Sequence, residues 1–167
     1  NQAQGREISV RQLLDQGRHR ILTSLTESPE VRAQLLLDIG RIYHNLGVDP
    51  VAIETLSAAL AGLASPQDQA RALTERASAF NTAGELQRAM ADAQAALQLL
   101  PQQIGAARVA ATVALAQAQV DLGQLDQGAQ TLEQLRAAVQ QLPVRIALPS
   151  KRPSILRSIQ PRSTQPQ

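Results

Sequence analysis

The side chains best suited to chemistry in this 167-residue chain are its two histidines, His19 and His44, and a few carboxylates set close together. The chain has no cysteine, and two histidine ligands are too few to hold a structural metal ion. Asp121 and Asp126 lie on either side of a predicted turn, where solvated helix ends explain them better than acid–base catalysis. Neither a glycine-rich phosphate loop nor a nucleophile with a marked base is visible. We therefore expect no enzyme activity, no cofactor and no metal site in this chain.

The elements that must position any functional residue are predicted to be helices. Hydrophobic residues make up 44% of the chain but aromatic residues only 1%, which argues against a β-sandwich or barrel. Alanine, leucine and glutamine dominate, and all three favour helices. No apolar run approaches the length of a membrane span, and the lack of cysteine excludes a disulfide scaffold. The chain begins at Asn1 without a methionine, which suggests a processed product or a piece of a longer protein.

The formal net charge of +2 is distributed unevenly. Residues 1–142 hold 11 arginines and 14 acidic residues, a balance of −3, whereas residues 143–167 hold five basic residues and no acid, a balance of +5. We therefore expect no nucleic-acid interface on the body. The tail also has five of the nine prolines, so we expect it to be flexible. Contact of the tail with acidic lipid or nucleic acid is the weaker alternative.

Start and stop signals recur along the chain and predict seven helices joined by short connections. Ser9, Ser28 and Ser65 are candidate N-caps, and Asp49 marks a further helix start. Short connections require neighbouring helices to pack antiparallel. The predicted helices cover residues 9–25, 28–46, 49–63, 65–83, 85–100, 104–122 and 124–142.

Three glycines divide the chain into repeated units. Gly47, Gly84 and Gly123 each stand between two amphipathic helices, at separations of 37 and 39 residues. Glycine is best suited to the left-handed position after a helix, and such a period with two helices per unit is typical of a solenoid. Residues of matched size recur around each glycine: Leu36, Ile39, Gly40, Tyr43, Ala52, Leu56 and Ala59 in the first unit, Leu73, Ala77, Phe80, Ala89 and Ala96 in the second, and Thr112, Leu115, Ala116, Gln119, Gly128 and Leu132 in the third.

This pattern resembles the tetratricopeptide repeat over residues 28–142. The resemblance implies an all-α fold, an α-solenoid with a right-handed superhelix of about three helical hairpins, at 28–64, 65–101 and 102–142. In that fold Gly40 lets two helices approach closely and Tyr43 fills the gap between them, whereas Gln119 stands where an aromatic residue is expected. A leader with one helix precedes the repeats at 1–27, and the basic tail follows at 143–167. An ordinary bundle of alanine-rich helices is the alternative.

A second resemblance lies in the stretch that leads into the first repeat. Residues Gly5 to Gly17, Ser28 to Leu36 and Ile39 to Tyr43 are similar to the region before tetratricopeptide repeats at the C-terminus of many bacterial serine/threonine protein kinases. None of the kinase motifs occurs in this chain, so the resemblance implies a kinase domain upstream and no catalytic residue here. Related leaders also occur in other multidomain regulators.

The tetratricopeptide resemblance also implies a binding surface, because the first helix of each pair lines the concave face in that family. Arg41 and Arg71 would there supply charge-assisted donors to a carboxylate or a chain terminus. A polar face with no specific ligand is the alternative. The groove-facing positions carried over to this sequence are Gln34, Leu37, Arg41, His44 and Asn45 in the first unit, Arg71, Thr74, Ser78, Asn81 and Thr82 in the second, and Val113, Gln117, Val120 and Asp121 in the third.

The last predicted helix carries an apolar stripe that no later helix covers. Three alternatives are open: the array continues, the tail folds back onto the stripe, or two copies of the chain form a homodimer through this helix. The stripe contains Leu125, Ala129, Leu132, Leu135, Val139 and Leu142, and the apolar residues of the tail are Ile146, Leu148, Ile155, Leu156 and Ile159.

We therefore expect a protein–protein interaction module with a protein or peptide partner in its groove. The resemblances favour the non-catalytic C-terminal part of a bacterial serine/threonine kinase or a related signalling protein. A stand-alone adaptor for an envelope or secretion complex and the ligand-sensing region of a transcription regulator are the alternatives. The sequence does not decide between the bacterial cytoplasm and the periplasmic side of a membrane-anchored protein.

Overall fold

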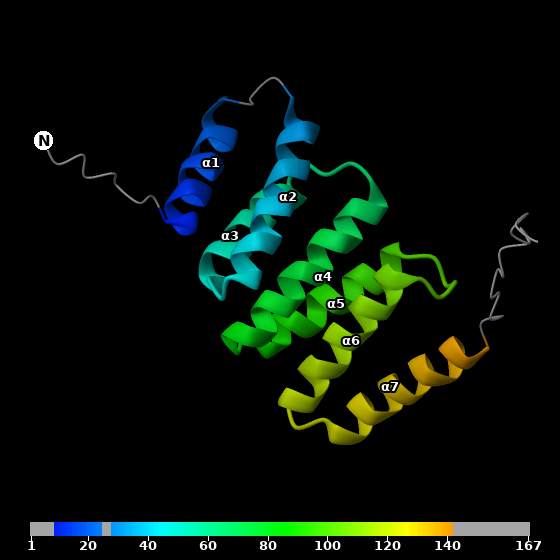
Figure 1. The fold of residues 1–167 in the computed structure, drawn as a ribbon. Helices are drawn as coiled ribbons and strands as arrows, with labels where there is room; N and C mark the ends of the chain where they lie inside the picture. The colour runs from blue at the N-terminus through cyan, green and yellow to red at the C-terminus, as the bar shows by residue number, and fades with distance from the viewer. Residues whose placement is uncertain (1–8, 25–27, 142–167) are drawn as a thin grey trace, which may run out of the picture.

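The computed structural model describes residues 9–24 and 28–141, and these residues confirm the all-α class (Figure 1). Within them the chain forms seven helices and no strand. Each helix contacts the one that follows it, and α4 also contacts both α2 and α6. The helices are α1 (Val10–Ser24), α2 (Pro29–Asn45), α3 (Asp49–Leu60), α4 (Pro66–Ala83), α5 (Leu86–Leu99), α6 (Ala106–Asp121) and α7 (Leu125–Gln140).

The predicted helix bounds agree with the observed ones to within three residues wherever the two can be compared. The largest difference is at α3, which ends at Leu60 where the sequence predicts Leu63. The basic tail at 143–167, the leader residues 1–8 and the predicted helix ends at Leu25 and Leu142 lie outside the described residues. The predictions made for those segments therefore stay predictions.

Two of the three predicted serine N-caps make the capping hydrogen bond. Ser9 N–H donates to Gln12 Oε1 at 3.0 Å and Gln12 N–H donates to Ser9 Oγ at 3.2 Å, which is the capping-box arrangement. Ser65 Oγ accepts a hydrogen bond from Asp68 N–H at 3.4 Å. Ser28 stands at the N-cap position before Pro29, as predicted, but its side chain makes no capping hydrogen bond. Its ψ of 71° differs from the 124° of Ser65, so the backbone does not present the hydroxyl to the first turn.

The three repeat glycines take the predicted left-handed conformation. Gly47, Gly84 and Gly123 have φ angles of 70°, 77° and 78°. Each glycine N–H donates to the carbonyl three residues before it, and the next N–H donates to the carbonyl five residues before it, at 2.8–3.1 Å. This pair of bonds is the Schellman motif, which satisfies carbonyl groups that the helix end would leave unpaired. The same turn thus begins the second helix of each hairpin.

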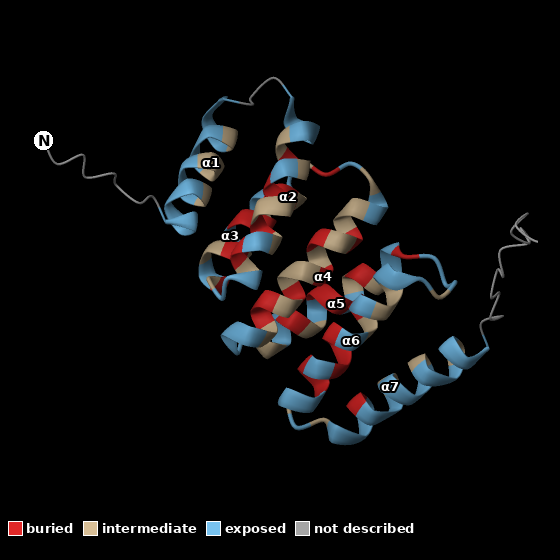
Figure 2. Ribbon diagram, in the orientation of Figure 1, coloured by how far each residue is buried: buried red, intermediate tan, exposed pale blue. Residues whose placement is uncertain are grey.

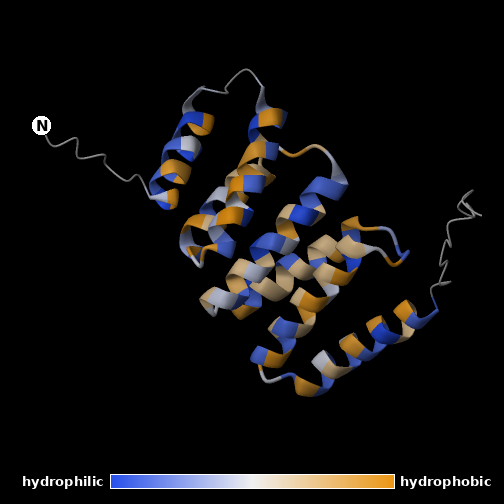
Figure 3. Ribbon diagram, in the orientation of Figure 1, coloured by the Kyte–Doolittle hydropathy of each residue, from blue (hydrophilic) through white to orange (hydrophobic). Residues whose placement is uncertain are grey.

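The core lies between the helices of the first two hairpins and along one side of α6 (Figure 2). Tyr43 and Phe80 are the two largest fully buried side chains among the described residues, and most other buried positions are alanine. Alanine adds little bulk, so the helices pack closely around the two aromatic rings. Burial falls off at both ends, because α1 has no buried residue and α7 buries Gly128 alone. Figure 3 shows that apolar residues nevertheless continue along α7.

The close approach of α2 and α3 at Gly40 is confirmed. A Cβ atom built at Gly40 would lie 2.6 Å from Cγ and 2.8 Å from Cδ2 of Leu56, far inside van der Waals contact. Leu56 is fully buried, so it has no space into which to move. Only glycine therefore fits at this crossing without displacing the core.

The N-terminal helix α1 is attached to the first hairpin by polar contacts. The buried Tyr43 donates its hydroxyl hydrogen to Asp15 Oδ1 at 2.6 Å, and Arg18 Nη2 lies 2.7 Å from Glu54 Oε1. The pKa of Tyr43 is raised to about 12. Burial of the phenol is the larger cause, and the hydrogen bond to the Asp15 carboxylate is the second. Ile21 adds an apolar contact to the core beneath.

The connection between the second and third hairpins is held by Arg108, a role that the sequence did not reveal. Arg108 Nη1 donates to the carbonyls of Leu97, Leu100 and Pro101 at 3.3, 3.3 and 3.0 Å, and its Nη2 donates to Gln102 Oε1 at 3.1 Å. A guanidinium suits this place because several donors in one plane can satisfy the unpaired carbonyls at the end of α5. Arg108 thus fixes the angle at which α6 leaves α5.

Candidate functional site on α2, α4 and α6

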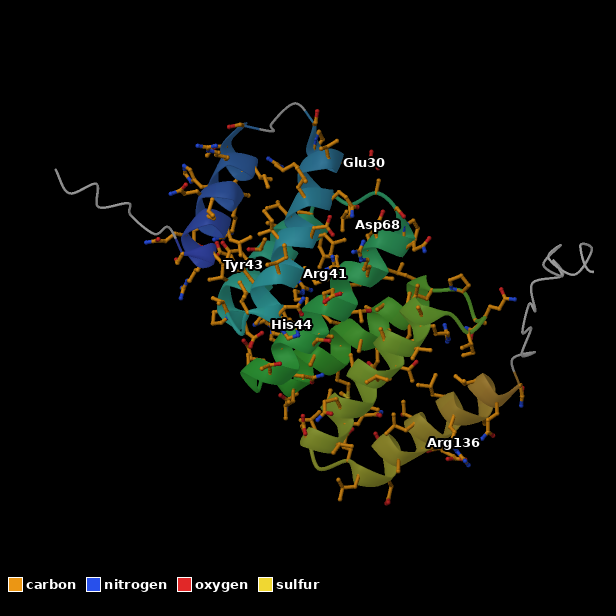
Figure 4. All side chains as sticks on the ribbon, in the orientation of Figure 1. Glu30, Arg41, Tyr43, His44, Asp68 and Arg136 are labelled. Carbon is orange, nitrogen blue, oxygen red and sulfur yellow. The ribbon has the colours of Figure 1, made fainter. Side chains whose placement is uncertain are left out.

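The first helices of the three hairpins form one continuous surface, since α4 contacts both α2 and α6 (Figure 1). These are the helices on which the sequence analysis placed its binding residues. Acidic side chains occupy the first turns of α2 and α4 at Glu30 and Asp68, where they interact favourably with the helix dipole (Figure 4). The remaining polar residues on these helices are therefore the ones to examine for binding.

A depression of about 460 Å³ crosses the three helices and brings six of the predicted residues together. His44 enters it from α2, three residues enter from α4, and two enter from α6: Ser78, Asn81 and Thr82, and Val113 and Gln117. Ala110 and Ala114 complete the lining and, with Val113, form an apolar floor beside the polar side chains. Such a mixture of apolar surface with a few oriented polar groups is typical of binding sites.

His44 is oriented by the carboxylate of Asp49, which the sequence indicated only as the start of a helix. The helix start predicted at Asp49 is confirmed, with Val48 as the N-cap residue before it. The buried side chain of Asp49 turns toward His44, with 2.6 Å between His44 Nδ1 and Asp49 Oδ1. This contact fixes the imidazole plane and occupies Nδ1, which leaves Nε2 free to bind a ligand.

Asn81 is the polar group at the centre of the depression. Its Nδ2 donates to the carbonyl oxygen of Ala114 at 3.0 Å, which ties α4 to α6. Its Oδ1 is buried and has no hydrogen-bond partner among the described residues. An unpaired buried acceptor costs about 1–3 kcal/mol, but this oxygen is enclosed by the chain, so a ligand in the depression does not reach it.

The neighbouring hydroxyl and amide groups donate within their own helices and keep acceptor capacity. Ser78 Oγ donates to the carbonyl of Thr74 at 3.1 Å, and Thr82 Oγ1 donates to the carbonyl of Ser78 at 3.1 Å. Gln117 Nε2 donates to Asp121 Oδ2 at 2.8 Å. A hydroxyl that donates once can still accept from a ligand, and so can the carbonyl oxygen of Gln117. The depression therefore offers several acceptors to a donor such as a peptide N–H.

Arg41 and Arg71 lie on the same surface and share a carboxylate that sequence reasoning missed. Asp38 Oδ1 is 3.3 Å from Arg71 Nη2 and 3.8 Å from Arg41 Nη2. All three side chains are roughly two-fifths exposed, so the contacts are weak and open to competition from a ligand carboxylate. The cluster carries one net positive charge. The signal in the sequence was the spacing of Asp38 three residues before Arg41.

Two predicted groove residues are not available for binding. Leu37 is fully buried and packs with Leu56 and Ala72, because α4 covers that side of α2. Thr74 is also buried, and its hydroxyl donates to the carbonyl of Ala70 at 2.8 Å. The prediction that these two side chains face the groove is therefore wrong. The structure places the exposed Asn45 and Asp121 and the half-buried Gln34 on α2 and α6, outside the lining of the depression.

The described part of the chain adds two further findings. It contains no group of three or more histidine or acidic side chains that could hold a metal ion. None of its helices is long and apolar enough to cross a lipid bilayer.

Comparison of the chain with models of known protein families, with curated proteins and with solved structures finds no match. The functional argument therefore rests on the residues of the chain itself.

Proposed function

We propose that this chain is a protein-interaction module of the tetratricopeptide type, an α-solenoid with a right-handed superhelical path whose α2, α4 and α6 line a concave groove. The partner is an extended peptide segment of another protein. The observation that carries the proposal is the depression in which His44, Ser78, Asn81 and Gln117 converge from three successive hairpins. Six of the residues carried over from the repeat family line this one depression, which an arbitrary bundle of helices would not require.

The chemistry of the groove favours a peptide backbone. The carbonyl oxygen of Gln117 and the hydroxyl oxygens of Ser78 and Thr82 suit backbone N–H groups, and His44 Nε2 can bind a backbone or side-chain group beside them. The apolar floor at Val113, which is about half exposed, suits one small apolar side chain of the peptide. Arg41 and Arg71 suit a carboxylate, which would compete with Asp38 for their guanidinium groups.

Random peptides displayed on phage and selected on the immobilised chain test the proposal. Binding of the selected peptides is then measured by calorimetry against two groove variants. Both His44→Ala with Gln117→Ala and Arg41→Ala with Arg71→Ala should weaken binding by at least about tenfold, or about 1.4 kcal/mol. The control is Gln94→Ala with Arg20→Ala, two exposed residues on α5 and α1. Unchanged affinity in both groove variants, with their melting temperatures preserved, would contradict the proposal.

The leader resemblance places this module, in our proposal, within a bacterial signalling protein with a serine/threonine kinase domain. Reading the coding sequence on both sides of the chain tests that part separately. A glycine-rich loop and a catalytic aspartate loop upstream are expected. A start codon close to Asn1, or an upstream DNA-binding domain, would instead support one of the two alternatives, the stand-alone adaptor or the transcription regulator.

A further inference from the structure

The polar side chains that line the depression between α2, α4 and α6 present acceptors rather than donors to a ligand. The hydroxyl groups of Ser78 and Thr82 have one hydrogen each, and each donates it to a backbone carbonyl of α4 at 3.1 Å. Their oxygen atoms remain able to accept. Asn81, which lies between them in the sequence, uses an N–H of its side chain to bond the carbonyl of Ala114 at 3.0 Å.

Two carboxylates outside the lining hold the donors of its other two polar side chains. A carboxylate oxygen only accepts, so Asp49 Oδ1, at 2.6 Å, keeps the hydrogen of the neutral His44 ring on Nδ1. Nε2 of that ring is then an acceptor. Asp121 Oδ2 accepts from Gln117 Nε2 at 2.8 Å in the same way, which fixes the amide and leaves Oε1 free to accept.

The charges around the lining favour a cation. The eight lining residues include no lysine, arginine or carboxylate. On α2, α4 and α6 the charged residues one helical turn from the lining are Arg41, Glu75 and Asp121, of which two are acidic. Arg41, the one base, is directed toward Asp38, which is 3.8 Å away and three residues nearer the start of α2, and therefore away from His44. A cation in the depression therefore gains more from nearby carboxylates than it loses to Arg41.

A peptide backbone alone satisfies this lining only in part. Each peptide unit brings one C=O with every N–H, and the lining has few donors left for those carbonyls. A primary ammonium brings three donors and no acceptor, which suits acceptors that converge from three helices. A guanidinium holds its donors in one plane and suits acceptors that lie in one plane. The four free acceptors are His44 Nε2, Ser78 Oγ, Thr82 Oγ1 and Gln117 Oε1.

We propose that the depression binds the side chain of a lysine of the partner peptide, and this inference rests on the function proposed above. The ammonium group donates to the four free acceptors. The methylene stem covers the apolar floor of Ala110, Ala114 and the half-exposed Val113, in place of a separate apolar side chain. Lysine side chains pack their stems along apolar surface in this way while the ammonium stays beside polar groups. One lysine thus matches both parts of the depression.

Peptides selected by phage display on the full chain, then synthesised with an acetylated N-terminus, test the inference. They should share a lysine at one position. Replacing this lysine by norleucine, which keeps the stem but lacks the ammonium, should weaken binding at least about tenfold in calorimetry. The same replacement should matter much less for the chain with His44→Ala and Gln117→Ala, which has lost two acceptors. His19→Ala, which removes the exposed histidine of α1, is the matched control and should retain the full effect.

Several results of the peptide measurements would overturn the inference. Lysine-free peptides whose binding the groove variants weaken would overturn it and leave the proposed function intact, whereas a selection that yields no binding peptide would overturn both. Loss of binding on acetylation, with the lysine unchanged, would assign the depression to the N-terminal amine of the peptide. Equal binding after replacement of the lysine by arginine would indicate a site for any cation rather than for lysine.

The tautomer of His44 gives an independent measurement on the full chain without a peptide. Nitrogen NMR spectra at about pH 8, where imidazole rings are neutral, should show the His44 hydrogen on Nδ1, whereas the exposed His19 should sample both tautomers. Asp49→Asn should release this constraint and weaken binding of the lysine peptide, with the helical circular dichroism retained. A hydrogen on Nε2 of His44 in the unaltered chain would overturn the inference, because the depression would then present a donor to the ammonium.

Discussion

The first two hairpins and the third begin their second helix with the same backbone turn but pack around it differently. At the position four residues before the repeat glycine stand Tyr43, Phe80 and Gln119. The carbonyl of each accepts the same Schellman hydrogen bond, at 2.8–2.9 Å. The turn therefore does not depend on the side chain. What differs is how each hairpin fills the space between its helices.

Charged side chains contact both aromatic residues. Asp15 of α1 binds the hydroxyl of Tyr43. The guanidinium of Arg88 lies 4.1 Å from the centroid of the Phe80 ring, a favourable cation–π distance. Arg76 lies 5.7 Å from the same ring and binds both oxygens of Asp92, at 2.6 and 2.9 Å.

The third hairpin replaces this arrangement with polar contacts. Gln119 Oε1 accepts a hydrogen bond from Thr131 Oγ1 at 2.8 Å, and Gln124 Oε1 is buried without a partner among the described residues. These polar side chains bury less apolar area than an aromatic ring does. The comparison indicates that the repeat turn sets the path of the chain. The residue four positions before the repeat glycine sets how stably the two helices of that hairpin pack. We expect α6 and α7 to be the least stable hairpin.

The largest expected effect comes from removing an aromatic ring. Phe80→Ala should lower the free energy of unfolding by about 3–5 kcal/mol, because a large buried side chain leaves a cavity. Gln119→Ala at the equivalent position should cost about 1 kcal/mol, the net value of one hydrogen bond. Urea denaturation of the two variants measures both values. If Phe80→Ala does not fold, Phe80→Leu takes its place, and equal costs at the two positions would refute the comparison.

Removing the ion pair of the second hairpin should have the next largest effect. Asp92→Ala leaves the mostly buried Arg76 guanidinium without its bidentate partner, which should cost about 3 kcal/mol. Thr131 occupies the equivalent position in the third hairpin, and Thr131→Val should cost about 1 kcal/mol or less. The same urea titration measures both variants. A loss for Thr131→Val as large as that for Asp92→Ala would show that the polar contact of the third hairpin is as strong as the ion pair.

A smaller difference is expected between two glycines at close helix crossings. Gly40→Ala should cost about 1–3 kcal/mol, because the new Cβ meets the buried Leu56. At Gly128 a new Cβ would lie 2.6 Å from Cγ2 of Val120 and 3.3 Å from the backbone carbonyl oxygen of Ala116, but Val120 is 37% exposed whereas Leu56 is fully buried. The helix propensity of alanine offsets about 1 kcal/mol at both glycines, so Gly128→Ala should cost less than Gly40→Ala. Melting temperatures measure the difference, and the opposite order would contradict it.

The smallest expected effect is a pH dependence confined to the first hairpin. The pKa of Tyr43 is raised from 10.0 to about 12, so the folded chain holds the phenol proton more tightly than the unfolded chain. This contribution to stability is complete below pH 10 and is lost as the pH rises toward about 12. Thermal unfolding between these pH values should show the decline, and Tyr43→Phe should not. A decline of equal size in Tyr43→Phe would assign it to other groups.

Much of the fold could be predicted from local signals along the chain. Proline and serine at helix starts and glycine at helix ends act within one turn, so the seven helices and the Schellman turns follow from the sequence. The position of Ser28 follows in the same way, but its missing side-chain hydrogen bond does not, because a cap motif does not specify the backbone angles at the N-cap.

The candidate site was predicted in part. Six residues of the depression were predicted because the tetratricopeptide resemblance implies that they face the groove: His44, Ser78, Asn81, Thr82, Val113 and Gln117. Asp49 and Asp38 were missed as partners of His44 and Arg71, since an ion pair depends on which rotamers bring two side chains together. Leu37 and Thr74 were assigned wrongly, because the same face that lines the groove is partly covered by the next helix.

The sequence by itself determined the helices, their turns and the period of the repeat, because these depend on interactions within a few residues. The tertiary structure decided what each repeated position meets. Leu56, Ala93 and Leu132 hold the same place in the repeat, but within residues 9–24 and 28–141 a further hairpin covers only the first two. Burial depends on neighbours that are distant in the chain, and periodicity alone does not supply them.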